Sequence, residues 1–142
     1  AKMRRLQGVR KVLLLEEAWK AIAKEGMASY VKYLFKTVRK YFGEAIVVTQ
    51  EVEDIISSPI VKESIINNAD CKILLDQRKY RNKFDQIQTL LGLTDKERAQ
   101  VLSINLSNDP ARRYKEVFIS LGGVQSAVYA TEVSDEEYLV RP

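Results

Sequence analysis

Residues Lys11–Trp19 read KVLLLEEAW, and this stretch decides the fold. The apolar residues that precede Glu16 and Glu17 form a short run typical of a buried strand in a parallel sheet. Open α/β sheets bind their ligands just beyond the carboxyl ends of such strands. Two carboxylates at that point suit a nucleotide-bound Mg²⁺ and an attacking water. This is the arrangement of a Walker B motif in a P-loop ATPase.

The same two carboxylates also have a plainer interpretation. A helix that begins after the strand carries a partial positive charge at its N-terminus, which favours acidic residues there. Glu16 and Glu17 would then stabilise a helix start and perform no chemistry. This stretch alone leaves both interpretations open.

A second strand is predicted at AIVVT, residues Ala45–Thr49, and it ends at Gln50. Between the two strands, apolar residues at helical spacing predict a helix over Met27–Phe42, with Gly43 as its C-terminal stop. A strand–helix–strand unit makes its strands parallel, so Gln50 is expected at the same sheet edge as the paired acids. A glutamine amide there can contact a γ-phosphate oxygen or orient a water molecule, although a polar residue can equally just end a strand.

The remaining pattern predicts an α/β fold that finishes in antiparallel strands. Gly122 and Gly123 separate two alternating runs and predict a β-hairpin. Thr94 and Glu97 form a capping-box pattern, which predicts a helix start. The other expected elements are an opening strand over about Val9–Leu15, short helical faces near Trp19–Ile22, Val52–Ile56 and Val61–Ile66, a third strand over Cys71–Asp76, a helix over Phe84–Leu91 that ends at Gly92, hairpin strands over Tyr114–Leu121 and Gln125–Val133, and a last turn capped by Ser134.

Length and composition limit the function classes. The 142 residues suffice for one ordinary domain with its own core, and 46% hydrophobic with 30% charged residues are typical of a globular protein. One cysteine and no histidine exclude an intramolecular disulfide, a zinc site and any histidine-based triad, and they suggest a reducing compartment. The net charge of +4 permits contact with nucleic acid or an anionic membrane without requiring it.

The start of the chain suggests that it is a piece of something longer. Residues Ala1–Arg5 lack the apolar core of a signal peptide, and position 1 is not methionine. No apolar stretch approaches the roughly 20 residues that span a bilayer. The first predicted element is a buried strand with nothing before it to cover both faces. We therefore expect the chain to be the C-terminal half of a nucleotide-binding domain.

The chain contains two characteristic stretches, LLLEEAW (Leu13–Trp19) and, further on, RKYFGEAIVVTQ (Arg39–Gln50). With these stretches it resembles the conjugation ATPases of type IV secretion systems, in particular the TraG-type ATPases of conjugative transposons. LGLTDKE (Leu91–Glu97) and RYKEVF (Arg113–Phe118) resemble the C-terminal part of the same family, so the resemblance covers nearly the whole chain. These ATPases belong with the HerA and FtsK motors on a RecA-like fold. The resemblance implies that residues 1–142 form the C-terminal half of a RecA-like P-loop NTPase domain, from the Walker B motif onward.

The resemblance also implies roles for individual residues. Glu16 takes the Mg²⁺-binding Walker B position, Glu17 is the carboxylate that polarises water, and Gln50 contacts the γ-phosphate. Arg39 is the candidate arginine finger that reaches a neighbouring subunit, and its alternative is a cation that favours a helix C-terminus. Glu16 departs from the more usual Asp, which moves the carboxylate by about 1.5 Å, one carbon–carbon bond.

The implied cofactors are ATP and Mg²⁺, and the implied activity is ATP hydrolysis that energises conjugative DNA transfer. The implied partners are further copies of the protein in a ring, a hexamer in this family, other type IV secretion subunits, and DNA or its relaxase complex. The implied location is the cytoplasm, at the periphery of the inner membrane. The chain contains no G-x-x-x-x-G-K-[ST] pattern, so we expect it alone neither to hydrolyse ATP nor to bind it tightly.

Two alternatives stay open beside this hypothesis. One is a DNA-translocating ATPase of the HerA/FtsK type, and the other is a non-enzymatic α/β module that binds a partner or nucleic acid. Three other features have a plainer expectation. KYRNK (Lys79–Lys83) mixes basic and aromatic residues that could contact nucleic acid or a partner protein, but a solvated loop or helix start is the favoured interpretation. Arg112 and Arg113 could reach a nucleotide, but we expect them to be surface residues at the start of a strand. Cys71 is expected to be a small core residue.

Overall fold

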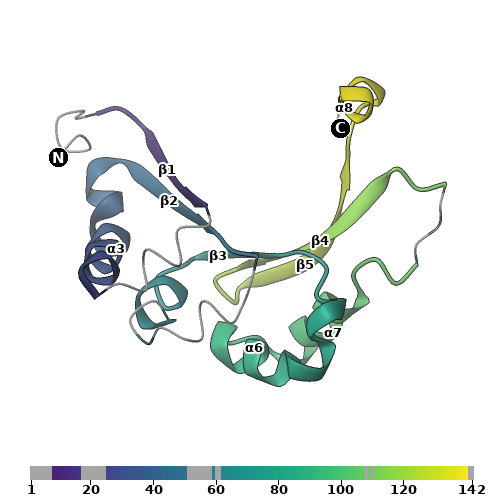
Figure 1. The fold of residues 1–142 in the computed structure, drawn as a ribbon, viewed down its shortest axis with the longest axis horizontal. Helices are drawn as coiled ribbons and strands as arrows, with labels where there is room; N and C mark the ends of the chain where they lie inside the picture. The colour runs from purple at the N-terminus through teal and green to yellow at the C-terminus, as the bar shows by residue number, and fades with distance from the viewer. Residues whose placement is uncertain are drawn as a thin grey trace. The chain divides into compact units, whose positions relative to one another are not determined.

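The structure, a computed structural model, describes residues 8–16, 25–50, 59, 62–107, 109 and 111–140. The chain divides into two compact units, residues 1–69 and residues 70–142. Each unit has its own sheet and its own helices (Figure 1). This combination confirms the predicted α/β class.

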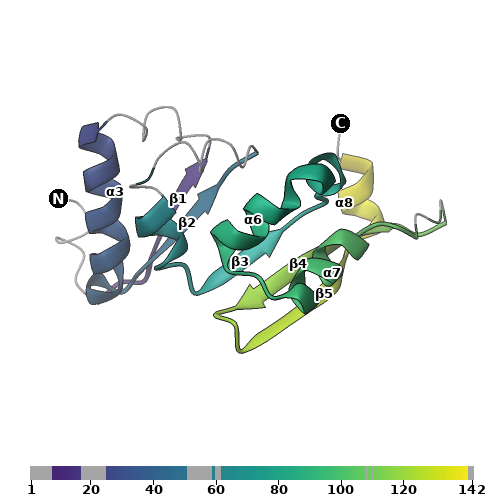
Figure 2. The same cartoon turned by 90° about the horizontal axis from the view of Figure 1, so that it is seen from below.

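Two parallel strands with a helix beside them form the framework of residues 1–69 (Figure 2). The strands pair in parallel, with Glu16 level with Val48. This pairing confirms the strand–helix–strand unit, and the predicted strand boundaries differ from the observed ones by at most two residues. The described elements of this unit are β1 (Lys11–Glu16), α3 (Glu25–Thr37), the 3₁₀ helix η1 (Val38–Tyr41), β2 (Gly43–Val48) and the π-helical turn η2 (Lys62–Ile66).

The parallel pair has one half-buried face and one open face. Leu13, Leu15 and Val47 alternate with exposed neighbours along the strands and are half-buried. The open face is apolar as well, and its side chains are 40–63% exposed: Val12, Leu14, Ile46 and Val48. The sequences of β1 and β2 are typical of strands buried on both faces, but one face of this pair is exposed to solvent.

The helix predicted over Met27–Phe42 ends earlier than expected. α3 stops at Thr37, and the 3₁₀ helix η1 follows it. The left-handed residue is Phe42, with φ of 53°, and the expected role of Gly43 as the helix stop is wrong. The Phe42 N–H donates to the Arg39 carbonyl at 3.1 Å, and Gly43 is already paired with β1 as the first residue of β2. The turn that ends the helical segment therefore lies at Phe42, one residue before the glycine.

An antiparallel three-stranded sheet carries residues 70–142, with α6 and α7 on one of its faces (Figure 1). The predicted hairpin is confirmed, and Gly122 and Gly123 have positive φ of 58° and 75°. The third predicted strand pairs antiparallel with the first hairpin strand. The elements are β3 (Cys71–Leu74), the 3₁₀ helix η3 (Arg78–Lys83), α6 (Phe84–Leu91), α7 (Asp95–Ser103), β4 (Tyr114–Leu121), β5 (Gln125–Glu132) and α8 (Asp135–Val140).

Apolar side chains of α6, α7 and β4 make the core of the second unit. Phe84 of α6 and Phe118 of β4 are fully buried. Burial of each such aromatic ring stabilises the fold by roughly 1.5–3 kcal/mol, and this supports the sheet on the helical side. The other buried apolar residues are Ile87, Leu90, Leu93, Val101, Ile104 and Val117.

Cys71 is exposed, so the prediction that it is a small core residue is wrong. It opens β3, an edge strand, opposite Leu121, which is 49% exposed. Ile73, on the same face of β3, is 60% exposed. The exposed face of β3 is the one that carries Cys71 and Ile73, so an apolar run that predicts a buried strand is exposed to solvent on one side.

Two of the expected short helical faces, near Trp19–Ile22 and Val52–Ile56, lie outside the described residues. The third, near Val61–Ile66, corresponds to η2. The helix over Phe84–Leu91 ends as predicted, because Gly92 adopts a left-handed φ of 65°. Ser134 caps α8 through a hydrogen bond of 3.2 Å from the Glu137 N–H to its hydroxyl oxygen.

Glu97 completes the predicted capping box and has a pKa below its ordinary value. Its carboxylate is buried, which is the largest single effect and opposes ionisation. The Thr94 N–H donates to it at 2.8 Å and the Ser120 hydroxyl at 3.2 Å. These bonds, with those of the Thr94 and Ser126 hydroxyls, together outweigh burial and lower the pKa.

The lowered pKa predicts a pH-dependent share of stability. Because the unfolded chain takes up the proton at about pH 4.3, the ionised Glu97 stabilises the fold above that pH. This share disappears as the pH falls through the lower folded pKa. We expect Glu97→Gln to lower the free energy of unfolding at pH 7 by about 1–3 kcal/mol, and the deficit to shrink in acid. Urea unfolding at neutral and acidic pH measures this, with the exposed Glu132→Gln as the control. A deficit that grows in acid would contradict it.

Candidate functional site

The parallel register brings two of the predicted site residues to one edge of the first sheet. Glu16 ends β1 level with Val48 of β2, and Gln50 follows two residues later. At about 3.3 Å per residue and about 4.8 Å between strands, the Cα atoms of Glu16 and Gln50 lie about 8 Å apart. Both side chains are exposed, so both are accessible to a ligand at the carboxyl edge of the sheet.

Glu17, the predicted catalytic carboxylate, lies outside the described residues. In the sequence it directly follows Glu16, the last residue of β1. Its role therefore stays a prediction.

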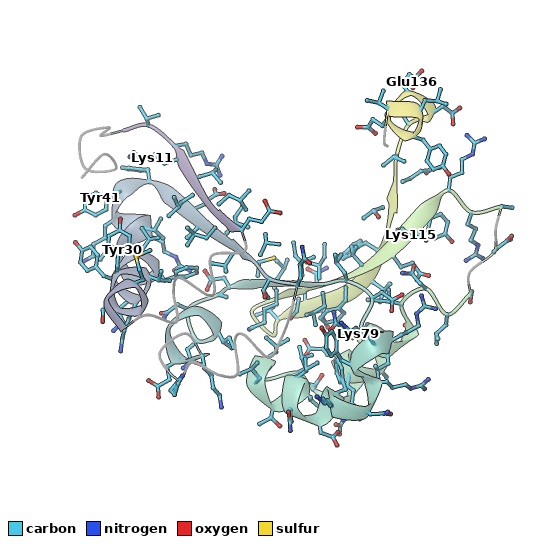
Figure 3. All side chains as sticks on the ribbon, in the orientation of Figure 1. Lys11, Tyr30, Tyr41, Lys79, Lys115 and Glu136 are labelled. Atoms are coloured by element: carbon cyan, nitrogen blue, oxygen red, sulfur yellow. The ribbon has the colours of Figure 1, made fainter. Side chains whose placement is uncertain are left out.

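Arg39 lies at the opposite edge of the same sheet. It belongs to η1, which leads into the start of β2. The Lys11 N–H donates to the Phe42 carbonyl at 3.0 Å and the Lys11 ammonium to the Tyr41 carbonyl at 2.6 Å, which fixes this turn at the amino end of β1 (Figure 3). A six-residue strand spans about 17 Å, so one chain does not bring Arg39 to Glu16 and Gln50.

The carboxyl edge offers the donor types that suit nucleotide-bound Mg²⁺. Mg²⁺ prefers oxygen ligands and is commonly held by one or two carboxylates together with substrate phosphates. Glu16 supplies such a carboxylate and Gln50 an amide that can accept or donate. Across the described segments, no group of three or more acidic or cysteine side chains is gathered that could hold a metal by itself. Glu16 and Gln50 are thus donors of the types that hold Mg²⁺ together with phosphates.

The two arginines before β4 have ordinary structural contacts. Arg113 forms an ion pair with Asp135 at the start of α8. Arg112 stacks over the Tyr114 ring, with 5.5 Å between its guanidinium carbon and the ring centroid. These contacts agree with the expectation that the two arginines are surface residues at the start of a strand.

A polar hollow of about 290 Å³ lies beside this strand entrance in the second unit. Arg112 and Lys115 line it, but so do Asp109 and Glu116. Since the charges of its walls balance, the hollow has no preference for an anion and gives no candidate nucleotide site.

None of the helices in the described segments has the length and apolar character that a bilayer crossing requires.

One family model covers nearly the whole chain, and one curated relative covers about two thirds of it. A family model described as the TraG P-loop domain matches residues 1–141. The type IV secretion system protein CagE of Helicobacter pylori is 32% identical over 92 residues, which are 65% of this chain and 9% of CagE.

The fold also has a solved relative. The structure of VirB4 of Thermoanaerobacter pseudethanolicus is similar with a TM-score of 0.67 and 25% identity, over 96% of this chain and 35% of that one. The chain thus spans about a third of the solved relative and less than a tenth of CagE.

Proposed function

The chain belongs to the TraG P-loop domain family, and from this premise we propose that its parent protein is an ATP-hydrolysing motor that energises conjugative DNA transfer through a type IV secretion system. The observation that carries the proposal is the parallel register of β1 and β2, which brings Glu16 and Gln50 to one edge. Ligands of open α/β sheets bind at this carboxyl edge. The similarity to CagE, a type IV secretion system protein, supports the link to secretion.

Residues 1–142 would form the C-terminal half of a RecA-like domain, from the Walker B motif onward. The open face of the parallel pair supports this assignment, because its exposed residues include Val12, Leu14 and Ile46. Parallel sheets are normally covered on both faces, and a two-stranded sheet is marginal by itself. Further strands and helices of the same domain would complete this sheet and cover it.

The four site residues would divide the chemistry between two subunits. Glu16 would help hold Mg²⁺, Glu17 would orient and polarise the attacking water, and Gln50 would contact the γ-phosphate. Mg²⁺, when bound, supplies positive charge that offsets the charge developing on the phosphates. Arg39 would serve the site of a neighbouring subunit, because its own chain places it at the opposite sheet edge.

A trans arginine would require a ring, and we propose a hexamer whose turnover in each site depends on the position of its neighbour. The other partners would be type IV secretion subunits and DNA or its relaxase complex, with the motor in the cytoplasm at the periphery of the inner membrane. The chain has no P-loop, so the phosphates lack their main backbone donors and their lysine. We propose that the chain alone is inactive and that the parent supplies this cradle.

The test is ATP hydrolysis by the purified parent protein, measured as phosphate release. We expect turnover with Mg²⁺ and its loss when EDTA removes the metal, because the phosphate charge is then no longer offset. A parent protein that binds no ATP and releases no phosphate would contradict the proposal and favour the non-enzymatic module. Strong stimulation by duplex DNA would favour the DNA-translocating alternative of the HerA/FtsK type.

A further inference from the structure

The 3₁₀ helix η3, Arg78–Lys83, is a compact cluster of positive charge, which we call the basic turn. It reads RKYRNK, so four of its six residues are cationic and none is acidic. Residues 70–142 as a whole carry equal numbers of acidic and basic side chains, eleven of each. The basic turn is therefore a local concentration of positive charge in a neutral unit.

Two cations of the basic turn lack the acidic partners that the arginines around them have. Arg78 is bound to Asp76 at 2.6 Å, and Arg98 and Arg113 form ion pairs with other carboxylates. Within the described part of the chain, no carboxylate lies within salt-bridge distance of Lys79 or Arg81. Their charges are available to an external anion.

The backbone holds these two side chains on a fixed support. The Arg78 N–H donates to an Asp76 carboxylate oxygen at 3.0 Å, and the Tyr80 N–H donates to the Gln77 carbonyl at 2.9 Å. At its other end the turn runs directly into α6, whose first residue, Phe84, is fully buried. Less conformational entropy is lost when a ligand binds such a turn than when it binds a mobile loop.

The side chains of the basic turn suit a phosphodiester chain with unpaired bases. Lys79 and Arg81 are exposed, and Figure 3 shows the labelled Lys79 on this turn. The Lys79 ammonium lies 5.4 Å from the centre of the Tyr80 ring, which places an aromatic face beside a cation. Single-strand binding sites combine cations that follow the backbone with aromatic rings on which bases stack.

The turn lacks the features of two other kinds of surface. Protein interfaces have a desolvated apolar core, and membrane-binding surfaces insert apolar side chains. The exposed side chains of the basic turn are cationic or amide, and the partly exposed ring of Tyr80 is the one aromatic surface of this turn, which is too small for either kind of surface. A polyanion is the ligand that this composition fits.

We propose that the basic turn binds the phosphate backbone of single-stranded DNA, with Lys79 and Arg81 as its phosphate contacts. The inference deepens the proposed function by giving the motor a place where the transferred DNA touches it, and it rests on that function for the biological meaning of the contact. The binding itself involves neither ATP nor Mg²⁺, so it can fail or succeed independently of hydrolysis.

The experiment compares double variants of this chain, made in the parent protein, by fluorescence anisotropy, with a labelled oligothymidine of about 30 nucleotides and no nucleotide or metal. Two lost phosphate contacts reduce the slope of log K against log salt by about 1.4. We therefore expect Lys79→Ala/Arg81→Ala to weaken binding about 25-fold at about 0.1 M salt. Far-UV circular dichroism confirms that the variants keep the fold.

The matched control is Lys32→Ala/Lys36→Ala, which removes the same charge from exposed positions on α3. We expect this control to bind within about threefold of the unaltered chain and to keep its salt slope. Equal losses in both double variants would overturn the proposal, since binding would then follow net charge only. Tighter binding to a duplex of the same length would overturn the assignment to single strands.

Discussion

Replacing Arg39 by alanine in the full-length parent protein is expected to lower kcat for ATP hydrolysis by about 10³–10⁵-fold. An arginine finger offsets the negative charge that develops on the transferred phosphoryl group, and its removal leaves that charge exposed. Arg39 stands at the amino edge of the parallel pair, so it is remote from Gln50 of the same chain. The expected effect is therefore on the site of a neighbouring subunit, measured as steady-state phosphate release.

The control for Arg39 is its neighbour Lys40, which is also exposed and basic in the last turn of η1. Lys40→Ala is expected to change kcat by no more than about threefold, since surface charges that touch no ligand contribute little. Mixing the inactive Arg39→Ala and Glu17→Gln proteins should restore part of the activity, because some sites in a mixed ring then have both groups intact. A loss of less than about tenfold, or no recovery on mixing, would contradict action between subunits.

Glu17→Gln in the parent protein is expected to lower ATP turnover at least about 10²-fold, the effect of losing a positioned acid–base group. The amide keeps the size of the side chain but cannot accept the proton of the attacking water. ATP binding should persist, because the phosphates are held by the P-loop cradle and Mg²⁺. A kcat measurement combined with equilibrium ATP binding separates the two effects.

Glu44→Gln makes the same chemical change at the other end of the sheet. Glu44 lies at the start of β2, and its carboxylate forms an exposed ion pair with Arg10 at 3.0 Å. Such pairs contribute about 0–1 kcal/mol, so turnover should stay unchanged. If Glu17→Gln also left turnover unchanged, the acids would be helix-capping residues, as the plainer interpretation holds.

Local sequence signals predicted the elements that depend on local chemistry. The capping box at Thr94 and Glu97, the left-handed Gly92 and the glycine hairpin were all found where the sequence placed them. The shared edge of Glu16 and Gln50 follows from the strand–helix–strand order, because parallel strands carry their carboxyl ends to the same side. These predictions needed no knowledge of distant contacts.

Predictions that depended on tertiary contacts were less successful. An apolar run cannot say whether both faces of its strand are covered, and Cys71 stands on the open face of an edge strand. The apolar run that forms β3 also could not predict which strand β3 pairs with. Gly43 is the residue expected in a left-handed turn, but β2 pairing begins at Gly43 and the turn falls on Phe42. The position of strand pairing outweighed the local preference for glycine.

The candidate site likewise has features that the sequence could predict and features that it could not. The edge that carries Glu16 and Gln50 could be predicted, as could the place of Arg39 before the second strand. The availability of Lys79 and Arg81 could not, because a basic run in sequence does not reveal which cations have acidic partners in the fold. Only the pairing of Arg78 with Asp76 and the absence of such partners beside the other two in the described chain separate them.

The most direct measurement is the nucleotide sequence upstream of the codon for Ala1. The central claim is that Glu16, Glu17 and Gln50 serve a nucleotide whose phosphates another part of the same domain holds. The account predicts an upstream G-x-x-x-x-G-K-[ST] pattern in the same frame, preceded by an apolar strand-like run. An upstream coding sequence without that pattern, or a start codon directly before Ala1, would leave these side chains with no phosphates to act on and would contradict the account.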